Sequence, residues 1–301
     1  MRKLALLNSP SLLPESTRLG TLHMVVHDIK NLRLFYTDVL NLRVYEETPT
    51  TLLLGNSTHP LLHLRQDTQA QVYRNATGLY HFALKYDTEA DFATVIRHLY
   101  DRRIPNSPTD HGYSKSSYLS DPEGNTIELY VRTPKRSIYV ENEGEWEVHY
   151  SDGSIGNGRD PINLDELFSH LDPKRSFNTL QPSLGHLHLY GNSNQSMTHF
   201  YRDVLGFGEG VNLESFKLSD MSLSETQYHV IAFNEWKGPG IHAPNGKALG
   251  IDFYTLILDQ EKTLDEIKTR LKKHAIPFED NGDSIHLMDP SEIKLHIQLQ
   301  R

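Results

Sequence analysis

The clearest hydrophobic pattern in the chain is one that occurs twice. Two segments align without a gap: residues 19–42 (LGTLHMVVHDIKNLRLFYTDVLNL) and residues 184–207 (LGHLHLYGNSNQSMTHFYRDVLGF). In each segment a short apolar run of strand type leads into a stretch with apolar residues at helical spacing, which ends at a turn. Both segments therefore predict a strand followed by an amphipathic helix.

A second pair of segments repeats in the same way. The strand-like runs GLYHFAL (78–84) and GIDFYTL (250–256) precede helix-like stretches at residues 89–103 and 262–274. Both helical stretches run into Ile-Pro, and an Asp-Pro pair precedes the last strand-like run of each segment. These segments predict a second type of unit that also begins with a strand and a helix.

The two pairs divide the chain into four repeats, each expected to contain a strand, a helix and three short strands (βαβββ). The repeats span about residues 19–75, 76–135, 184–236 and 248–301. One such repeat leaves a sheet face uncovered, so we expect pairs of repeats to curl their sheets around a shared cleft. The expected fold is α+β, with domains at residues 19–135 and 184–301 and a connector at 136–183 that contains SDGSIGNGRDP.

Composition and charge limit the classes of function. Apolar residues make up 37% and charged residues 23% of the chain, which is typical of a folded globular protein. The formal net charge of −9 opposes binding to phosphate backbones, so we expect no nucleic-acid partner. The absence of cysteine excludes disulfides, thiol nucleophiles and thiolate metal sites. The 17 histidines and the carboxylates are therefore the metal ligands to consider.

Nothing in the sequence points to a membrane. No run approaches about 18 uninterrupted apolar residues. The opening residues, MRKLALLNSPSLLPES, contain too short an apolar run for a secretory signal. We therefore expect a cytoplasmic protein without a membrane partner, and a homo-oligomer is compatible with the sequence.

The repeat pattern, the FYxDVLxx helix ends and the DPEGNTIELY segment resemble the vicinal-oxygen-chelate superfamily. This superfamily includes glyoxalase I, fosfomycin- and bleomycin-resistance proteins and extradiol ring-cleaving dioxygenases. The resemblance covers nearly all of the chain outside the first 18 residues and the connector, and it implies cupped mixed sheets. In the superfamily the metal ligands lie on the first and last strands of paired repeats. His81 and Glu128 occupy these positions in the second repeat, so the resemblance implies that both bind a metal.

The third ligand depends on which repeats share a cleft. His188 serves if the second and third repeats pair, whereas His23 serves if the first and second repeats pair. His186 points to the same face as His188 by strand alternation, so we expect it either to replace His188 as the ligand or to support the ligands by hydrogen bonding. Two histidines and one carboxylate bind Fe(II) and leave open positions for a substrate and O2; the same ligands suit Mn(II).

The fourth repeat is expected to hold no metal. Phe253 stands where the second repeat has His81, although His296 matches Glu128. A cleft between the first and fourth repeats would therefore be structural or a second binding pocket.

Residues 109–128 resemble the signature of extradiol dioxygenases. The order His111, Tyr118, Asp-Pro-x-Gly and Glu128 matches the signature, with Ser117 where an apolar residue is usual. The resemblance implies that His111 hydrogen-bonds a catecholic oxygen. It also implies that Tyr118 hydrogen-bonds the substrate or the oxygen adduct.

Residues 227–236 (QYHVIAFNEW) resemble Tyr-His-His-His-x-Gly-Leu-Asn-x-Trp of the Bacillus-type catechol 2,3-dioxygenases. In ring-cleaving relatives a histidine at this place is the acid–base residue, and His229 fits that role. An imidazole pKa near neutrality suits proton transfer in both directions. The match favours the pairing of the second and third repeats, and with it His188. If the first and second repeats paired instead, His63 would be the acid–base residue.

The function implied by this resemblance is Fe(II)-dependent extradiol ring cleavage of a small catechol-type aromatic diol, with O2 as co-substrate. A glyoxalase-like isomerase or lyase is one alternative, but it usually has two carboxylate ligands, and only one occurs at the expected positions. A non-catalytic resistance protein that binds a drug or a quinol is a second alternative. Such a protein would keep the fold without the metal ligands.

Overall fold

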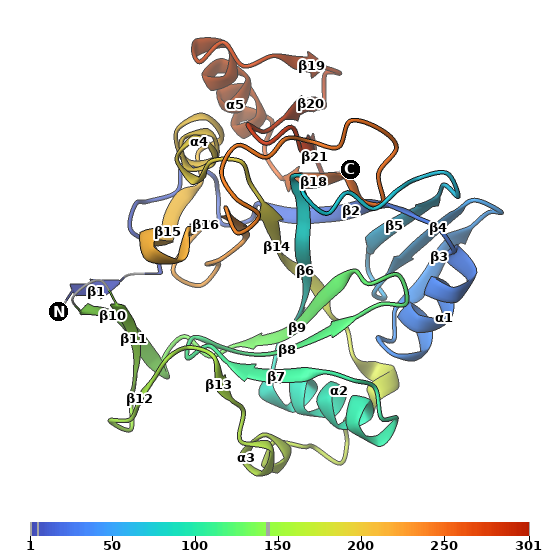
Figure 1. Ribbon diagram of the computed structural model, residues 1–301, viewed down its shortest axis with the longest axis vertical. Coiled ribbons are helices and arrows are strands. Elements are labelled where there is room, and N and C mark those ends of the chain that lie inside the picture. The colour runs from blue at the N-terminus through green and yellow to red at the C-terminus, as the bar shows by residue number, and fades with distance from the viewer. Residues whose placement is uncertain (1, 5, 143–144, 301) are drawn as a thin grey trace. The chain divides into compact units, whose positions relative to one another are not determined.

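The computed structural model describes residues 2–4, 6–142 and 145–300, and it contains all four βαβββ repeats (Figure 1). The first repeat comprises β2 (Arg18–Val26), α1 (Ile29–Asp38), β3 (Arg43–Glu47), β4 (Thr51–Gly55) and β5 (Pro60–Gln66). The second comprises β6 (Gly78–Tyr86), α2 (Glu89–Asp101), β7 (Ser107–Asp110), β8 (Ser114–Ser120) and β9 (Thr126–Arg132).

The third and fourth repeats follow the same order. The third comprises β14 (Ser183–Tyr190), α4 (Asn194–Thr198), the π-helical η2 (His199–Leu205), β15 (Gly208–Leu213), η3 (Glu214–Phe216), β16 (Leu218–Ser222) and β17 (Ile231–Asn234). The fourth comprises β18 (Gly250–Leu258), α5 (Glu261–Lys273), β19 (Phe278–Asp280), β20 (Ser284–Met288) and β21 (Lys294–Leu299). The predicted fold class is confirmed.

Two large mixed sheets contain the strands of the repeats. The nine-stranded sheet has the order β13-β7-β8-β9-β6-β14-β17-β16-β15. The eight-stranded sheet has the order β19-β20-β21-β18-β2-β5-β4-β3, which joins the fourth repeat to the first. Within each repeat the first strand is parallel to the last, as in the pairs β6–β9 and β18–β21. This arrangement places the first and last strands of a repeat side by side.

The chain is organised in two compact units, and each draws on separate stretches of sequence. Compact unit 1 is built mainly from Asp28–Leu61 and His81–Gly185. Compact unit 2 is built from Leu6–His27, Leu62–Tyr80 and His186–Arg301. The expected domain boundaries, at residues 135 and 184, stay a prediction.

The Asp-Pro and Phe-Tyr motifs that recur in the sequence form buried hydrogen bonds. The Tyr36 hydroxyl on α1 donates to the Asp121 carboxylate at 2.8 Å, and the Tyr201 hydroxyl on η2 donates to Asp289 at 3.0 Å. Complete burial and the neighbouring Asp121 charge raise the pKa of Tyr36 well above its ordinary value. These bonds fix a helix of one repeat against the turn before the last strand of another.

The sequence predicts turns at SDGSIGNGRDP and a helix at NLDELFSHL in the connector, but the structure also contains strands there. The connector contains β10 (Ser137–Asn142), β11 (Glu145–Tyr150), β12 (Ile155–Gly156), β13 (Asp160–Pro161), α3 (Leu164–Ser169) and η1 (Phe177–Thr179). Strands β10, β11 and β12 form a separate sheet with β1 (Arg2–Leu4), and β13 pairs with β7. The connector therefore adds an edge strand to the sheet of the second repeat.

The helices of the described residues are short. The longest, α2 and α5, have 13 residues each, and none of the described helices combines the length and the apolar character needed to cross a membrane. Thr88 caps α2 by accepting a hydrogen bond from the Asp91 N–H at 3.1 Å. The apolar face of α2 is fully buried, including Phe92, Ile96 and Leu99.

Candidate metal centre and acid–base residues

His81 and Glu128 lie on the neighbouring parallel strands β6 and β9 of compact unit 1. The register pairs Ala83 with Glu128, and the His81 Nε2 is 3.0 Å from the Glu128 Oε2. Each residue is only 3% exposed. The Ser116 hydroxyl donates to the other carboxylate oxygen, Oε1, at 2.6 Å. An imidazole nitrogen and a carboxylate oxygen are thus in contact in the protein interior. Buried carboxylates are generally paired with another group or bound to a metal.

Tyr118 and His111 are beside this pair. Tyr118 on β8 stands opposite Glu128 in the strand register, and its ring centre is 5.6 Å from that of His81. The Tyr118 hydroxyl is 2.9 Å from the His111 Nε2, and the His111 Nδ1 is 2.5 Å from the Gly158 carbonyl oxygen. A carbonyl oxygen can only accept, so Nδ1 carries a proton; in the neutral imidazole Nε2 then accepts from Tyr118.

The connector supplies part of this arrangement. Gly158 has a φ of +71°, and a Cβ at this position would lie 2.6 Å from the Trp146 ring. Only glycine satisfies both conditions without strain. The Tyr139 hydroxyl on β10 also donates to the carbonyl oxygen of His111, at 2.7 Å. Sequence analysis missed this role of the connector, because Gly158 and His111 are far apart along the chain.

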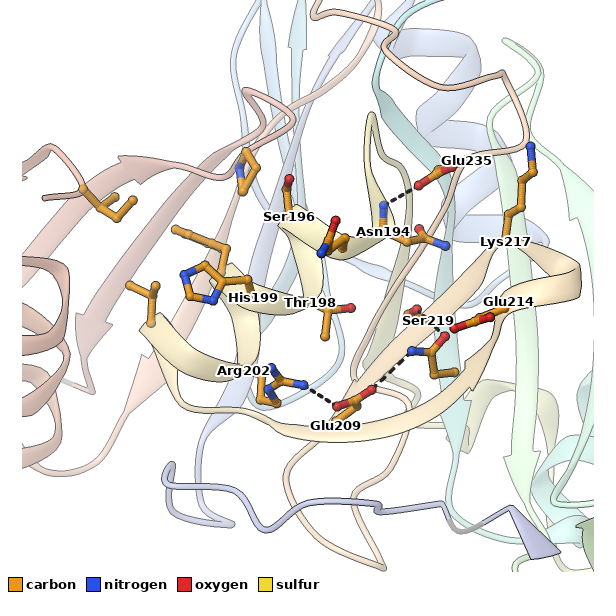
Figure 2. A pocket seen from close by; sticks show the side chains of 16 residues that line it. Asn194, Ser196, Thr198, His199, Arg202, Glu209, Glu214, Lys217, Ser219 and Glu235 are labelled. Atoms are coloured by element: carbon orange, nitrogen blue, oxygen red, sulfur yellow. Dashed lines mark hydrogen bonds and ion pairs between the residues drawn. The ribbon is translucent and has the colours of Figure 1, made fainter. Parts of the chain in front are cut away.

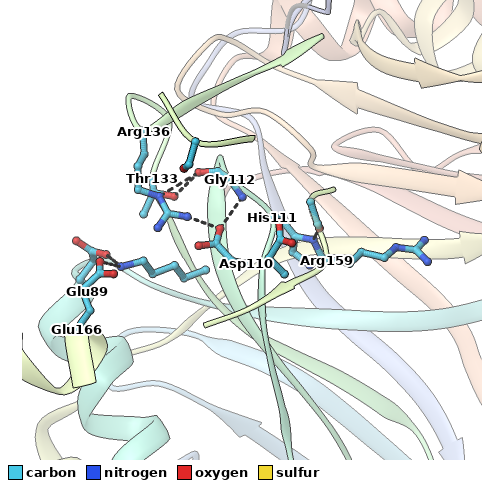
Figure 3. A network of polar contacts seen from close by, with 12 residues as sticks. Glu89, Asp110, His111, Gly112, Thr133, Arg136, Arg159 and Glu166 are labelled. Atoms are coloured by element: carbon cyan, nitrogen blue, oxygen red, sulfur yellow. Dashed lines mark hydrogen bonds and ion pairs between the residues drawn. The ribbon is translucent and has the colours of Figure 1, made fainter. Parts of the chain in front are cut away.

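A polar network fastens the connector to the second repeat (Figure 3). Lys115 on β8 is 2% exposed and forms ion pairs with Glu89 at 2.8 Å and with Glu166 at 2.9 Å. The Lys115 ammonium lowers the pKa of the Glu166 carboxyl. The Arg136 guanidinium pairs with Asp110, the residue before His111. The contacts of Lys115 link α2 to α3, so we assign this lysine a structural role.

His186 and His188 lie on β14 and are both buried in compact unit 2, with exposures of 3% and 4%. The His188 Nε2 is 2.8 Å from the Asn234 amide nitrogen, which can only donate. That nitrogen of His188 therefore accepts a hydrogen bond from the side chain of Asn234. The ring of His186 instead stands edge-on to that of His229, with centres 4.6 Å apart.

His229 lies before β17 rather than on it, and its backbone is unusual. Its φ of +55° is in the left-handed region, which non-glycine residues adopt rarely and often at functional sites. The His229 N–H donates to the Ser222 hydroxyl at 3.1 Å, and the ring Nδ1 is 2.6 Å from the Asp220 Oδ2. A carboxylate at Nδ1 holds the proton there and presents Nε2 as the atom that exchanges protons.

Asp220 is a functional candidate that sequence analysis missed. It is 3% exposed, and its Oδ1 accepts the Val211 N–H at 2.9 Å. Gly210 faces it so closely that any Cβ there would collide with the carboxylate. The available signal was an acidic residue in the middle of the short strand segment LSDMS, where a carboxylate needs a partner if it is buried.

The residues of the alternative third-ligand site also lie in compact unit 2. His23 on β2 and His63 on β5 are direct cross-strand neighbours, and their Nδ1 atoms are 3.0 Å apart. Burial first, and the nearby His63 second, lower the pKa of His23 to about 4. In the third repeat the equivalent register differs, since His188 is paired with Ala232 and not with His229. The similar sequence spacing of the two histidine pairs therefore hides different geometries.

A cavity of about 810 Å³ in compact unit 2 is separate from these residues. Figure 2 shows side chains from α4, η2, β15 and β16 around it, among them Asn194, Arg202 and Glu209. Arg202 pairs with Glu209 at 2.6 Å, and the Asn194 N–H donates to the Glu235 carboxylate at 2.6 Å. Arg202 and Glu209 thus neutralise each other, and we assign the cavity no role.

Known proteins with similar sequences identify the family to which the chain belongs. Residues 18–129 match the family model described as Glyoxalase/Bleomycin resistance protein/Dioxygenase superfamily. The chain is 26% identical over 280 residues to catechol-2,3-dioxygenase of Bacillus subtilis (strain 168), covering 92% of this chain and 95% of the relative. It is 30% identical over 159 residues to biphenyl-2,3-diol 1,2-dioxygenase 3 of Rhodococcus globerulus, covering 48% of this chain and 78% of the relative.

Solved structures share the fold. A putative dioxygenase from Bacillus subtilis superposes with a TM-score of 0.61 at 12% identity, covering 97% of this chain and 86% of that one. Glyoxalase I from Zea mays gives a TM-score of 0.57 at 15% identity, covering 94% and 92%. Four βαβββ repeats in two mixed sheets define a vicinal-oxygen-chelate protein. The chain belongs to the Glyoxalase/Bleomycin resistance protein/Dioxygenase superfamily.

Proposed function

We propose that the protein is an extradiol dioxygenase that cleaves the ring of a catechol-type aromatic diol with O2 at an Fe(II) centre. The observation that carries this proposal is the buried contact between His81 and Glu128, with the Tyr118–His111 pair beside it. The relative that matches most of the chain is named as a dioxygenase of catechol. The relative that matches about half of the chain is named as a dioxygenase of biphenyl-2,3-diol. The donor set, imidazole and carboxylate, is the one that non-haem iron prefers.

A histidine of β14 is proposed as the third ligand. Within compact unit 1, Gly185 at the start of β14 packs closely on Tyr130, and a Cβ at position 185 would collide with the Tyr130 hydroxyl. Tyr130 is two residues beyond Glu128 on β9. Within compact unit 2, the ring of Tyr80, the residue before His81, is 4.9 Å from that of His188. Both contacts support β14 as the source of the ligand.

His186 is the stronger candidate of the two histidines on β14. The Nε2 of His188 already accepts a hydrogen bond from Asn234, whereas the ring of His186 faces His229, the proposed acid–base residue. We therefore propose His186 as the ligand and retain His188, which the sequence favoured, as the alternative. An iron ion bound here would supply redox chemistry and lower the pKa of a bound diol.

His229 is proposed as the acid–base residue. With Nδ1–H directed at the Asp220 carboxylate, Nε2 takes a proton from a diol hydroxyl and returns it later in the reaction. The Asp220 charge stabilises the imidazolium that forms between the two transfers. Because Asp220 is itself held by the Val211 N–H, the pair is positioned before a substrate arrives.

Tyr118 and His111 are proposed to orient the substrate. The Tyr118 hydroxyl donates to His111, so its oxygen keeps a lone pair with which to accept from a hydroxyl of the diol. His111 acts through Tyr118 in this arrangement, which modifies the expectation that it contacts the substrate itself. The Gly158 carbonyl sets the tautomer of His111.

The glyoxalase-like alternative has less support. It would need a second carboxylate ligand. Asp220 is a candidate, because it is buried and contacts His229 at 2.6 Å. Both oxygens of Asp220 are engaged, one by the Val211 N–H and one by His229. The fold shared with glyoxalase I does not distinguish the two reactions, because one fold hosts many activities.

Oxygen uptake tests the proposal. Protein purified without oxygen, loaded with Fe(II) and mixed with catechol or 2,3-dihydroxybiphenyl should consume one O2 for each ring cleaved. Catechol should give a semialdehyde acid, and 2,3-dihydroxybiphenyl the corresponding phenyl keto acid. An isomerase would instead convert a glyoxalase-type substrate without oxygen uptake. Iron-loaded protein that binds neither diol and consumes no O2 would contradict the proposal.

A further inference from the structure

Five aromatic rings form a continuous row across five strands of the eight-stranded sheet, all within compact unit 2. In order they are His63 on β5, His23 on β2, Phe253 on β18, His296 on β21 and His286 on β20. Their successive ring centres are 4.8, 3.8, 4.0 and 3.6 Å apart. Each of the five residues is partly exposed. Four imidazoles on one accessible row are outside the proposed iron centre.

The pair at one end of the row has the geometry of two metal ligands. The Nδ1 atoms of His23 and His63 are 3.0 Å apart, and the two rings are inclined by 62°. Metal–imidazole bonds are about 2.0–2.1 Å long, so two nitrogens on one ion at angles near 90–110° lie roughly 2.9–3.4 Å apart. The two Nδ1 atoms now share a hydrogen bond, and their separation and inclined planes match what two imidazoles on one ion require.

The pair at the other end lacks this geometry. His286 and His296 are stacked at 3.6 Å with an angle of only 13° between their planes. A ligand lone pair lies in the plane of its imidazole ring, and nearly parallel planes do not converge on one ion. These two histidines therefore provide an internal comparison for the first pair.

Neighbouring residues hold the first pair in place. Phe253 stacks on the face of His23 at 3.8 Å with an angle of 15°, which restricts rotation of the imidazole. Asp252, the nearest acidic neighbour on β18, pairs with Lys294 at 3.2 Å and with Arg65 at 3.5 Å. Among the described residues, no carboxylate oxygen completes a three-ligand group with His23 and His63, so the donor set is two imidazoles.

We propose that His23 and His63 form a second metal site, selective for a late divalent transition metal and tightest for Cu(II). Imidazole pairs without carboxylate favour copper, nickel and zinc, and copper leads the Irving–Williams order. The ion takes the place of the proton between the two Nδ1 atoms, and that proton moves to Nε2 of the same ring. This proposal departs from the expectation that the first and fourth repeats hold no metal.

The test uses full-length protein in which His81→Ala and Glu128→Ala remove the proposed iron centre. We expect this variant to bind one equivalent of Cu(II) at equilibrium dialysis, with an electron paramagnetic resonance spectrum showing coupling to two nitrogens. Adding His63→Gln, or separately His23→Gln, should abolish that equivalent. Adding His286→Gln should leave both the stoichiometry and the spectrum unchanged.

Two results would overturn the proposal. One is an unchanged copper stoichiometry in both the His63→Gln and the His23→Gln proteins. The other is an equal loss of copper from the His286→Gln protein, which would place the ion elsewhere in the row. Circular dichroism checks the fold of each protein, and His63→Asn replaces His63→Gln if the latter does not fold. None of these results depends on ring cleavage, so failure here is distinct from failure of the proposed dioxygenase activity.

Discussion

Glu128 and Asp220 are buried carboxylates, and each is in contact with a histidine. Glu128 contacts His81 and accepts a hydrogen bond from Ser116, whereas Asp220 contacts His229 and accepts from a backbone N–H. Removing the partner of a buried carboxylate lowers the free energy of unfolding, by about 3–5 kcal/mol when the partner is the other member of an ion pair. These contacts therefore connect the proposed chemistry directly to single residues.

At the residue scale, Glu128→Ala and His81→Ala are each expected to abolish iron binding without unfolding the protein. Removing one of three ligands from an open site leaves too few bonds to retain a labile divalent ion. Elemental analysis of anaerobically loaded protein measures the change. Glu46→Ala, an exposed glutamate of the same compact unit, is the matched control and should bind iron normally. Full iron occupancy in folded Glu128→Ala protein would refute the ligand assignment.

The acid–base residue gives a second prediction at this scale. His229→Gln should retain iron and bind the diol but lower kcat by about 10²–10⁴-fold, the usual contribution of acid–base catalysis. Asp220→Asn should also lower kcat and should shift its pH profile, because the carboxylate no longer stabilises the imidazolium. Iron content is measured beside kcat and KM. Loss of iron from the His229→Gln protein, in place of slower turnover, would show that His229 is a ligand.

At the scale of elements, the connector has a defined structural role. Its strand β13 pairs with β7, and the Gly158 carbonyl on the preceding turn accepts from His111. The position of Tyr118 on β8 therefore depends on a segment about 40 residues further along the chain. Glycine spacing identified this segment as a turn, but its hydrogen-bonding partner could not be read from local sequence.

Gly158→Ala tests the role of that turn. A φ of +71° and the Trp146 ring 2.6 Å from the new Cβ should together lower the free energy of unfolding by about 1–3 kcal/mol. Gly153→Ala is the control, since its φ is also positive at +89° but its Cβ would meet open space. Denaturant unfolding compares the two variants. Equal losses of stability would mean that contact with Trp146 does not restrict Gly158.

At the scale of the whole molecule, the row of histidines in compact unit 2 affects stability in acid. Burial first and His286 second lower the pKa of His296 to about 4, with Lys294 lowering it further and Asp252 opposing the shift. The unfolded chain takes up this proton near pH 6.5 and the folded chain only near 4, so the unfolded state binds more protons between these values. The free energy of unfolding should therefore fall as the pH drops from about 6.5 to 4.

The contribution of His296 is expected to be on the order of 1 kcal/mol, because the side chain is partly exposed. His296→Gln should remove this part of the pH dependence when unfolding is followed by denaturant titration at pH 7 and pH 4.5. His242→Gln, at an exposed position, should retain the slope of the unchanged protein. A slope that is the same in the His296→Gln protein would exclude this residue as its source.

Local sequence was enough to predict the repeat architecture and to propose His81 and Glu128 as a pair. Helical and strand periodicity are local properties, so the helices were expected at residues 89–103 and 262–274 and are found at Glu89–Asp101 and Glu261–Lys273. His81 and Glu128 could be identified as a pair because they stand at equivalent places on the first and last strands of one repeat. The parallel register of β6 and β9 then brings the two side chains into contact.

Tertiary structure decided what depends on register and on contacts between distant segments. Similar spacing in sequence did not reveal that His23 directly faces His63 whereas His188 faces Ala232. It also did not reveal that Asp220 lies against His229. A shift of one residue in strand pairing changes every cross-strand neighbour, and the energy that selects the register comes from packing over the whole sheet. No local run of residues contains that information.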